Sequence, residues 1–419
     1  MKKKKILLIV RRHVGEIDFI LPLLYRLKNN FEIITIFSDQ YSYESLLNSK
    51  ELYFLWKKIC SKYFIVNNQK KIIYKAIFKI LTVIENKTSI QNNLKLFLLK
   101  KIFEFDFFLK KFELNINDIN LIFTPIVNQT SLPYLIKCLS KKSKLIKFSE
   151  STWIFPNKEE NKIVYDNNRS FIDYHTDLYL LTNNNFNYYL GNKINRELKK
   201  KILYTGFFKY ENFWIKKINK LKNNQKTKKK IIVIATRGPN NLALRLSSFM
   251  YIIESIIKSV KKMKNIKIIF KIHPNKIQDE IDIIKEITLR NNFKSFILST
   301  NHPINLAVDA QVCICINTSV CIDFLYAKKS VIEFFDAKKE KKNSPGVMFN
   351  VKKNMWVSNF ENYKLVNNVK NDEEFNYQFK RHLKNKSKLN KLNFKILKKI
   401  NSKSFDSLKL SNYLKNIQY

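Results

Sequence analysis

Two segments of the chain, one near residue 5 and one near residue 230, begin the same alternation of strand and helix. Residues 5–10 and 230–235 are apolar runs next to charged residues, the pattern of strands buried on both faces of a parallel sheet. Each run is followed by a helical pattern and then by a second apolar run, at 31–37 and at 266–272. A β-α-β order that starts twice predicts two α/β domains with parallel sheets.

The length of 419 residues suits two such domains. Further apolar runs extend the two series, at 121–124, 144–148, 177–181, 201–206, 296–298, 312–316 and 330–334. Between the series lies a Lys- and Asn-rich stretch with little apolar content, which predicts a linker. We therefore expect an N-terminal Rossmann-like domain at 1–215, a linker at 216–230, a C-terminal Rossmann-like domain at 231–360 and a helical tail at 361–419.

The formal net charge of +44 suggests nucleic acid, an anionic membrane face or an acidic substrate as a partner. Lysines are spread over the whole length, however, and glycine falls to 5 residues, which indicates a coding bias. The chain has no zinc-finger spacing, RNA-binding aromatic signature or compact basic region. We expect no specific nucleic-acid partner.

Cysteine content and hydropathy indicate the compartment. Five cysteines, an odd number, do not resemble a disulfide framework, and Cys313 and Cys315 alternate along an apolar run as buried side chains do. No stretch reaches the roughly 18 apolar residues of a membrane span, and the run at 6–10 is too short for a signal peptide. We expect a cytoplasmic protein.

The segment 94–113 mixes aromatic residues and lysines. Such a mixture suits a helix that docks on a membrane surface, and it equally suits a helix packed on a sheet. Apolar residues run almost all round the helix, which favours packing. A peripheral contact with the anionic inner membrane stays as the second interpretation.

Phosphate-binding candidates follow two strands of the second series. His273 and Pro274 follow the run at 266–272, and Asn317, Thr318 and Ser319 follow the run at 312–316. Ligands bind at the carboxyl edge of an open parallel sheet, and the start of a helix attracts anions. Each group alone also suits an ordinary turn or helix cap. Together, at two strand ends of one domain, they predict a nucleotide-phosphate site.

Three more residues of the second series are candidates for donor binding. Asp323 lies four residues beyond Ser319, on the same helical face, where a carboxylate suits ribose hydroxyls. Its alternative is a solvated helix acid. Arg237 and Gly238 follow the run at 230–235, where a guanidinium and a bare backbone suit a diphosphate. Their alternative is a plain turn.

Acids near the strand ends of the first series are candidates for a general base. Glu16 and Asp18 lie between the first strand and its helix, and Glu150 follows the run at 144–148. A carboxylate in a closed cleft can accept a proton from an attacking hydroxyl. Glu16 and Asp18 also suit the role of stabilising the positive end of the helix.

With these motifs the chain resembles the two-Rossmann-domain glycosyltransferases of the GT-B fold, in which two parallel sheets face a central cleft. The segment 203–210 is similar to the one that ends the first lobe in that superfamily. His273-Pro274 and Thr318-Ser319 resemble the His-Pro and Ser-Ser/Thr motifs of bacterial sialyl- and polysialyltransferases, which contact the donor phosphates. Residues 317–332 resemble the segment that binds the ribose, with Asp323 in place of Glu. Residues 13–16 resemble a segment of Kdo transferases whose Glu, here Glu16, is the base.

This resemblance implies a metal-independent glycosyltransferase that needs no cofactor and takes a nucleotide-sugar donor. Its acceptor would be a glycan or lipid-linked molecule of cell-surface polysaccharide assembly, such as capsule or lipopolysaccharide. Alternatives on the same scaffold are a sugar-nucleotide 2-epimerase and a polyol-phosphate transferase of the CDP-glycerol type. An alternative of another class is a non-catalytic nucleotide- or anion-binding protein.

Overall fold

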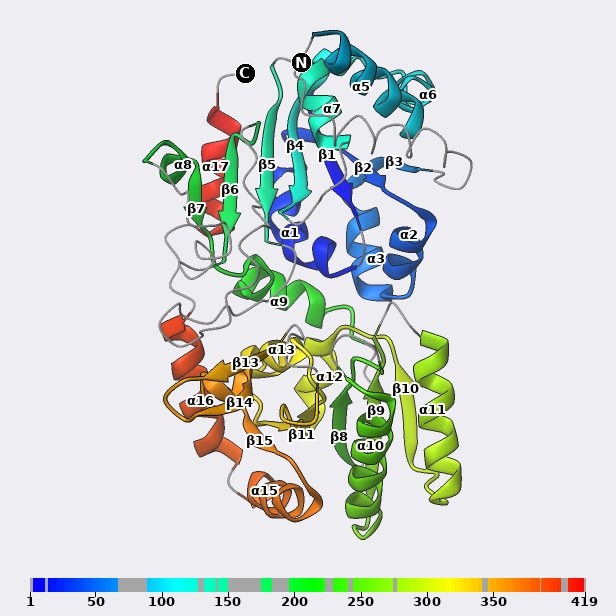
Figure 1. The fold of residues 1–419 in the computed structure, drawn as a ribbon, viewed down its shortest axis with the longest axis vertical. Helices are drawn as coiled ribbons and strands as arrows, with labels where there is room; N and C mark the ends of the chain where they lie inside the picture. Colours follow the sequence, from blue (N-terminus) through cyan, green and yellow to red (C-terminus); the bar gives the residue numbers. More distant parts are fainter. Residues whose placement is uncertain are drawn as a thin grey trace.

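The protein consists of two α/β lobes stacked along its long axis, shown in Figure 1. The computed structural model describes residues 3–11, 14–66, 89–126, 132–140, 142–149, 175–182, 196–222, 229–239, 244–273, 277–340, 346–384, 386–400 and 406–417. Strand–helix alternation occurs in both lobes, as the repeated apolar runs predict.

The first lobe contains a seven-stranded sheet within the described residues, in the order β3-β2-β1-β4-β5-β6-β7. Every neighbouring pair is parallel. The strands are β1 (Lys4–Val10), β2 (Phe31–Phe37), β3 (Cys60–Ile65), β4 (Ile119–Pro125), β5 (Lys144–Phe148), β6 (Leu178–Leu181) and β7 (Ile202–Tyr204). In β1 the six residues after Lys4 are all buried, because helices cover both faces of the sheet.

The second lobe contains a six-stranded parallel sheet in the order β10-β9-β8-β11-β12-β15, again within the described residues. Its strands are β8 (Lys230–Ala235), β9 (Ile266–Lys271), β10 (Phe296–Ser299), β11 (Ala310–Cys315), β12 (Val331–Phe334) and β15 (Asn367–Val369). An antiparallel hairpin of β13 (Val347–Asn350) and β14 (Met355–Ser358) lies beside it. The fold class predicted from the sequence is confirmed.

Helices connect the strands in both lobes. Those of the first lobe are α1 (Val14–Leu27), α2 (Gln40–Leu47), α3 (Lys50–Lys57), α5 (Ser89–Ile102), α6 (Phe105–Lys111), η1 (Ile116–Asp118), α7 (Leu132–Leu139) and α8 (Arg196–Lys200). Those of the second are α10 (Leu246–Lys261), α11 (Ile277–Arg290), α12 (Pro303–Asp309), α13 (Val320–Tyr326), α14 (Asn359–Asn362), α15 (Asp372–Lys384) and α16 (Lys386–Ile400). Leu99 of α5 and Phe108 of α6 belong to an apolar cluster of the first lobe, as the packed-helix interpretation predicts.

The lobes are joined by η3 (Phe208–Tyr210) and α9 (Asn212–Asn219), so the predicted linker begins within a helix. Trp214 and Ile218 of α9 are fully buried in an apolar cluster that contains side chains of both lobes. Burial of this surface favours a packed arrangement of the two lobes.

The range predicted as a helical tail, 361–419, contains strand β15 as well as helices. Its last helix, α17 (Ser407–Asn416), returns to the first lobe and packs beside α1 (Figure 1). There the Ser407 hydroxyl accepts a hydrogen bond from Arg26 Nε at 2.6 Å, and the Ser407 amide donates to Glu211. The tail therefore ties the two lobes together a second time.

Candidate functional site

A cleft between the lobes is lined from both sides. The first lobe contributes residues of α1, α3 and η3, and the second contributes residues that follow β9 and β11 or precede α12. The space not filled by protein atoms measures about 850 Å³, including space open to solvent. The cleft lies at the carboxyl edges of parallel strands, where such sheets bind ligands.

The charged centre of the cleft is Lys209, which comes from η3 between the lobes. Its ammonium lies 2.8 Å from a carboxylate oxygen of Asp18 in the first lobe and 2.8 Å from one of Asp323 in the second. Burial would lower the pKa of Lys209, but the two carboxylates outweigh it and the pKa is raised. This buried group is a permanent cation that links the lobes.

His302, at the start of α12, completes this network. Its Nε2 lies 3.2 Å from the second carboxylate oxygen of Asp18, and its Nδ1 accepts a hydrogen bond from the Ile304 amide. A neutral imidazole with an acceptor at Nδ1 carries its proton on Nε2, so His302 donates to Asp18. Burial would raise the pKa of Asp18, yet Lys209 and His302 hold it well below its usual range.

A second contact between the lobes lies beside this network. Oε1 of Glu51, from α3, accepts hydrogen bonds from the His302 amide and from Asn305 Nδ2, each at 3.2 Å. The residues in contact lie about 250 positions apart in the chain. The cleft is therefore held by polar contacts between residues that lie far apart in the chain and become neighbours only in the folded protein.

The floor of the cleft on the second lobe is formed where β9 ends. Lys271 and His273 both line it, and the His273 amide donates to Glu280 Oε2 at 3.0 Å. Burial raises the pKa of Glu280 to about 8, so this carboxyl group is mostly protonated at neutral pH. Burial lowers the pKa of Lys271 to about 8.

Thr318 and Ser319 line the cleft where β11 ends, as the sequence places them. Thr318 is buried, and its hydroxyl oxygen lies 3.4 Å from the Val320 amide. Asn317, just before them, has a positive φ of 43° and is buried outside the cleft lining. Thr318 and Ser319 thus contribute to the cleft surface, whereas Asn317 does not.

The cleft brings together five of the predicted residues, namely Asp18, His273, Thr318, Ser319 and Asp323. Glu16 is buried outside the lining, and its carboxylate accepts a hydrogen bond from the Arg11 amide at 2.7 Å. This contact joins α1 to the residue that follows β1. Its role as a base stays a prediction.

Arg237 and Gly238 are also outside the described lining of the cleft. Burial lowers the pKa of Arg237, and Gly238 has a φ of 70°, with the Glu280 side chain 3.5 Å from where a Cβ would lie. Glu150 and Pro274 lie outside the described residues.

Four titratable residues of the cleft were missed by sequence reasoning: Lys209, His302, Glu51 and Lys271. For two of them a signal exists in the sequence. His302-Pro303 repeats the His-Pro pair of His273-Pro274, and Lys271 stands two positions before His273. Lys209 is one of 78 Lys and Arg residues, and no local pattern distinguishes it.

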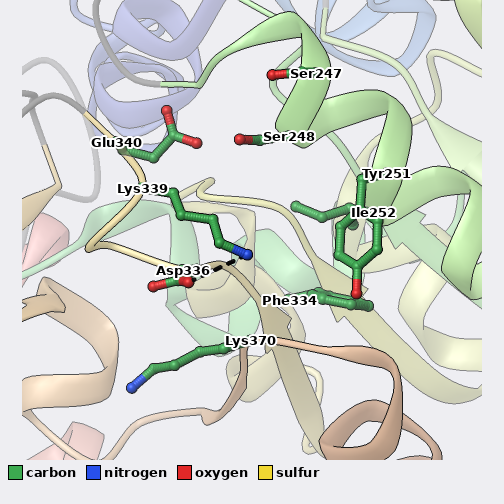
Figure 2. A pocket seen from close by; sticks show the side chains of 9 residues that line it. All are labelled: Ser247, Ser248, Tyr251, Ile252, Phe334, Asp336, Lys339, Glu340 and Lys370. Atoms are coloured by element: carbon green, nitrogen blue, oxygen red, sulfur yellow. Dashed lines mark ion pairs between the residues drawn. The ribbon is translucent and has the colours of Figure 1, made fainter.

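Another cavity lies in the second lobe at the start of α10, shown in Figure 2. Ser247 and Ser248 lie on one side of it, and on the other the Lys339 ammonium pairs with Asp336 at 3.6 Å. Its lining includes none of the predicted residues. The cleft between the lobes is therefore the candidate site.

The described residues contain no group of three or more His, Cys, Asp or Glu side chains placed to hold a metal ion. None of the described helices has the length and apolar character needed to cross a bilayer.

Comparisons with known proteins define the class of fold. No protein-family model matches the chain, and no curated protein matches it. Solved structures do: S. aureus MnaA with UDP has 12% identity and a TM-score of 0.55 over 99% of this chain and 98% of that chain. The glycotransferase of kitacinnamycin has 7% identity and a TM-score of 0.54 over 99% of each chain. The UDP-GlcNAc 2-epimerase of Neisseria meningitidis with UDP-GlcNAc has 11% identity and a TM-score of 0.53 over 98% of each.

These likenesses span both lobes and nearly the whole chain, so the fold is of the GT-B type, as the sequence resemblance implied. Identities of 7–12% establish the fold alone.

Proposed function

We propose that the chain is an enzyme that binds a nucleotide-linked sugar in the cleft and breaks the bond between the sugar and its diphosphate. The observation that carries the proposal is the single cleft in which His273, Thr318 and Ser319 of one lobe face Asp18 of the other. Hydroxyls and cations at strand ends suit phosphate oxygens. Two proteins of similar fold were solved with UDP or UDP-GlcNAc bound, which supports this choice of ligand.

In the proposed reaction the second lobe holds the donor. Negative charge grows on the diphosphate as the sugar leaves, and preorganised donors and cations at that position stabilise it. His273, Thr318 and Ser319 are the groups proposed to contact the phosphates, in a reaction that requires no metal ion. Catalysis would then consist mostly of positioning and charge stabilisation.

The proton acceptor is proposed to be one of the three acids predicted from the sequence, Glu16, Asp18 or Glu150. Both carboxylate oxygens of Asp18 are engaged, by Lys209 and His302, and its lowered pKa makes it a weak base. Glu16 is buried against the Arg11 amide. Asp18 is therefore the weakest candidate of the three.

Two outcomes of bond breaking are candidates. In glycosyl transfer, favoured by the motifs at 273–274 and 318–319, an acceptor hydroxyl attacks the sugar. In 2-epimerisation, favoured by the 2-epimerases among the proteins of similar fold, the sugar returns to the nucleotide with C2 inverted. A surface-polysaccharide acceptor belongs to the first proposal.

Product analysis separates these outcomes. Purified protein is incubated in deuterium oxide with UDP-, GDP-, CMP- and CDP-linked substrates, without and with glycan acceptors, and followed by NMR. Epimerisation needs no acceptor and exchanges the hydrogen at C2, whereas transfer needs an acceptor. Transfer of phosphorus with an alcohol would identify a polyol-phosphate transferase, and binding without turnover would contradict the enzymatic proposal.

We expect His273→Ala and Ser319→Ala each to weaken nucleotide-diphosphate binding about 10-fold or more, because each removes a hydrogen bond to a charged group. The measurement is calorimetric titration with the nucleoside diphosphate of the best substrate. Ser247→Ala is the matched control, since Ser247 lines the other cavity (Figure 2). Unchanged affinity in both cleft variants would refute the assigned phosphate site.

A further inference from the structure

Lys271 is a buried cation at the floor of the cleft. It is the last residue of β9, it is 5% exposed, and its side chain lines the cleft. Its ammonium donates to the carbonyl oxygen of Ile272 at 2.7 Å. Among the described residues no carboxylate oxygen lies within 4.0 Å of it, in contrast to Lys209, which has two such partners.

The acids that face Lys271 come from four helices and compensate its charge only in part. Glu280 of α11 is mostly protonated at neutral pH, and its Oε2 accepts a hydrogen bond from the His273 amide. Asp18 of α1 and Asp323 of α13 are paired with Lys209, and Glu51 of α3 binds groups of α12. All four favour the charged form of Lys271, yet burial outweighs them.

A buried ammonium without a close counter-ion is costly unless something else binds it. Lys271 remains mostly protonated at pH 7, because its pKa of about 8 is still above that pH. The groups beside it in the lining are His273 and the hydroxyls of Thr318 and Ser319, which suit an anion. An anion of two or more charges in the cleft would supply the missing partner.

We propose that Lys271 is the principal phosphate-binding cation of the cleft and contacts the diphosphate of the ligand directly. The identity of that ligand as a nucleotide-linked sugar rests on the proposed function, whereas the contact with a diphosphate does not. In the reaction Lys271 offsets the charge that develops on the leaving diphosphate. Lys209 does not compete for this role, because its charge is already balanced by two carboxylates.

The test uses calorimetric titration of the full chain with inorganic pyrophosphate and, separately, with UDP, at pH 8.5 in buffers of different ionisation enthalpy. At this pH free Lys271 is largely neutral, and a bound diphosphate raises its pKa. With UDP, whose phosphates do not titrate at this pH, the native protein therefore takes up protons on binding, at Lys271 and also at Glu280, whose pKa is about 8 too, and its affinity for UDP falls as the pH rises from 7 to 9. Lys271→Met is expected to bind about 10- to 100-fold more weakly at pH 7 and to take up fewer protons with UDP at pH 8.5 than the native protein does.

Lys267→Met is the matched control, since Lys267 lies on the same strand four residues away and outside the cleft lining. It is expected to retain the affinity and the proton uptake of the native protein. Lys271→Arg keeps the charge and is expected to recover part of the affinity.

The outcomes distinguish this inference from the proposed function. If Lys271→Met binds pyrophosphate and UDP as tightly as the native protein does, the inference is overturned. If the native protein binds pyrophosphate more tightly than Lys271→Met does but binds no nucleotide or nucleotide sugar, the result supports the inference and refutes the proposed function. Native protein that binds neither probe overturns both.

Discussion

Lys209→Met is expected to lower the free energy of unfolding by roughly 3–5 kcal/mol at pH 7, the usual cost of removing one partner from a buried ion pair. The variant leaves the carboxylates of Asp18 and Asp323 buried on opposite sides of a missing cation. Because these acids belong to different lobes, their repulsion also opposes packing of the lobes against each other.

The pH dependence gives this prediction a signature. The folded pKa of Asp18 is lower than its unfolded value, so its stabilisation is present above the unfolded pKa and is lost as the pH falls through the folded pKa. Without Lys209 the carboxylates gain from protonation. The difference between native protein and variant is therefore greatest at pH 7 and shrinks toward pH 4.

Urea unfolding of both proteins at pH 7 and pH 4 measures these differences. Lys216→Met, at an exposed position of α9, is the control and is expected to change stability by less than about 0.5 kcal/mol. Adding Asp323→Asn to Lys209→Met should recover part of the loss, because one of the two facing charges is removed. A loss at pH 7 that is small, or that grows in acid, would contradict the ion-pair explanation.

The two-domain α/β fold could be predicted because buried parallel strands are continuous apolar runs, and β1 and β8 are clear examples. Less apolar elements escaped prediction. In β3 the first four residues, 60–63, are not buried, and β15 contains two asparagines, so neither forms an apolar run. The return of α17 to α1 depends on contacts such as Arg26 with Ser407, 381 positions apart, which no local pattern encodes.

The candidate site also contains residues that could be predicted from the sequence and residues that could not. His273, Thr318 and Ser319 could be placed at one edge because the ends of parallel strands meet there. The partners of Asp18 could not, since Lys209 and His302 are 191 and 284 residues away and become neighbours only when the lobes pack. As a result, the sequence suggested a base where the structure has an ion-pair network.

Lys271→Met is expected to have the opposite effect on stability from Lys209→Met, although both replace a buried lysine of the same cleft. Among the described residues no carboxylate oxygen lies within 4.0 Å of the Lys271 ammonium, and burial lowers its pKa from 10.5 to about 8, a difference equivalent to roughly 3 kcal/mol. Methionine has a similar shape and carries no charge. The free variant should therefore be more stable than the native protein at pH 7, by up to about 3 kcal/mol.

The sign of the pH dependence follows from the protons bound. Between pH 8 and 10.5 the unfolded chain holds the Lys271 proton and the folded chain does not, so the stability contributed by this group rises with pH. The gain in the free energy of unfolding from Lys271→Met is therefore complete below pH 8 and disappears by about pH 10.5. Urea unfolding of native protein, Lys271→Met and Lys267→Met at pH 7 and pH 10 tests this.

A variant that is less stable than native protein at pH 7 would show that the hydrogen bond from Lys271 to the Ile272 carbonyl outweighs the burial of charge. The expected result has a further meaning when combined with the titrations. A lysine that destabilises the free protein but strengthens diphosphate binding has a role in ligand binding and not in folding, since functional sites are commonly less stable than the rest of a protein. Lys209, whose removal costs stability, is placed for the packing of the lobes.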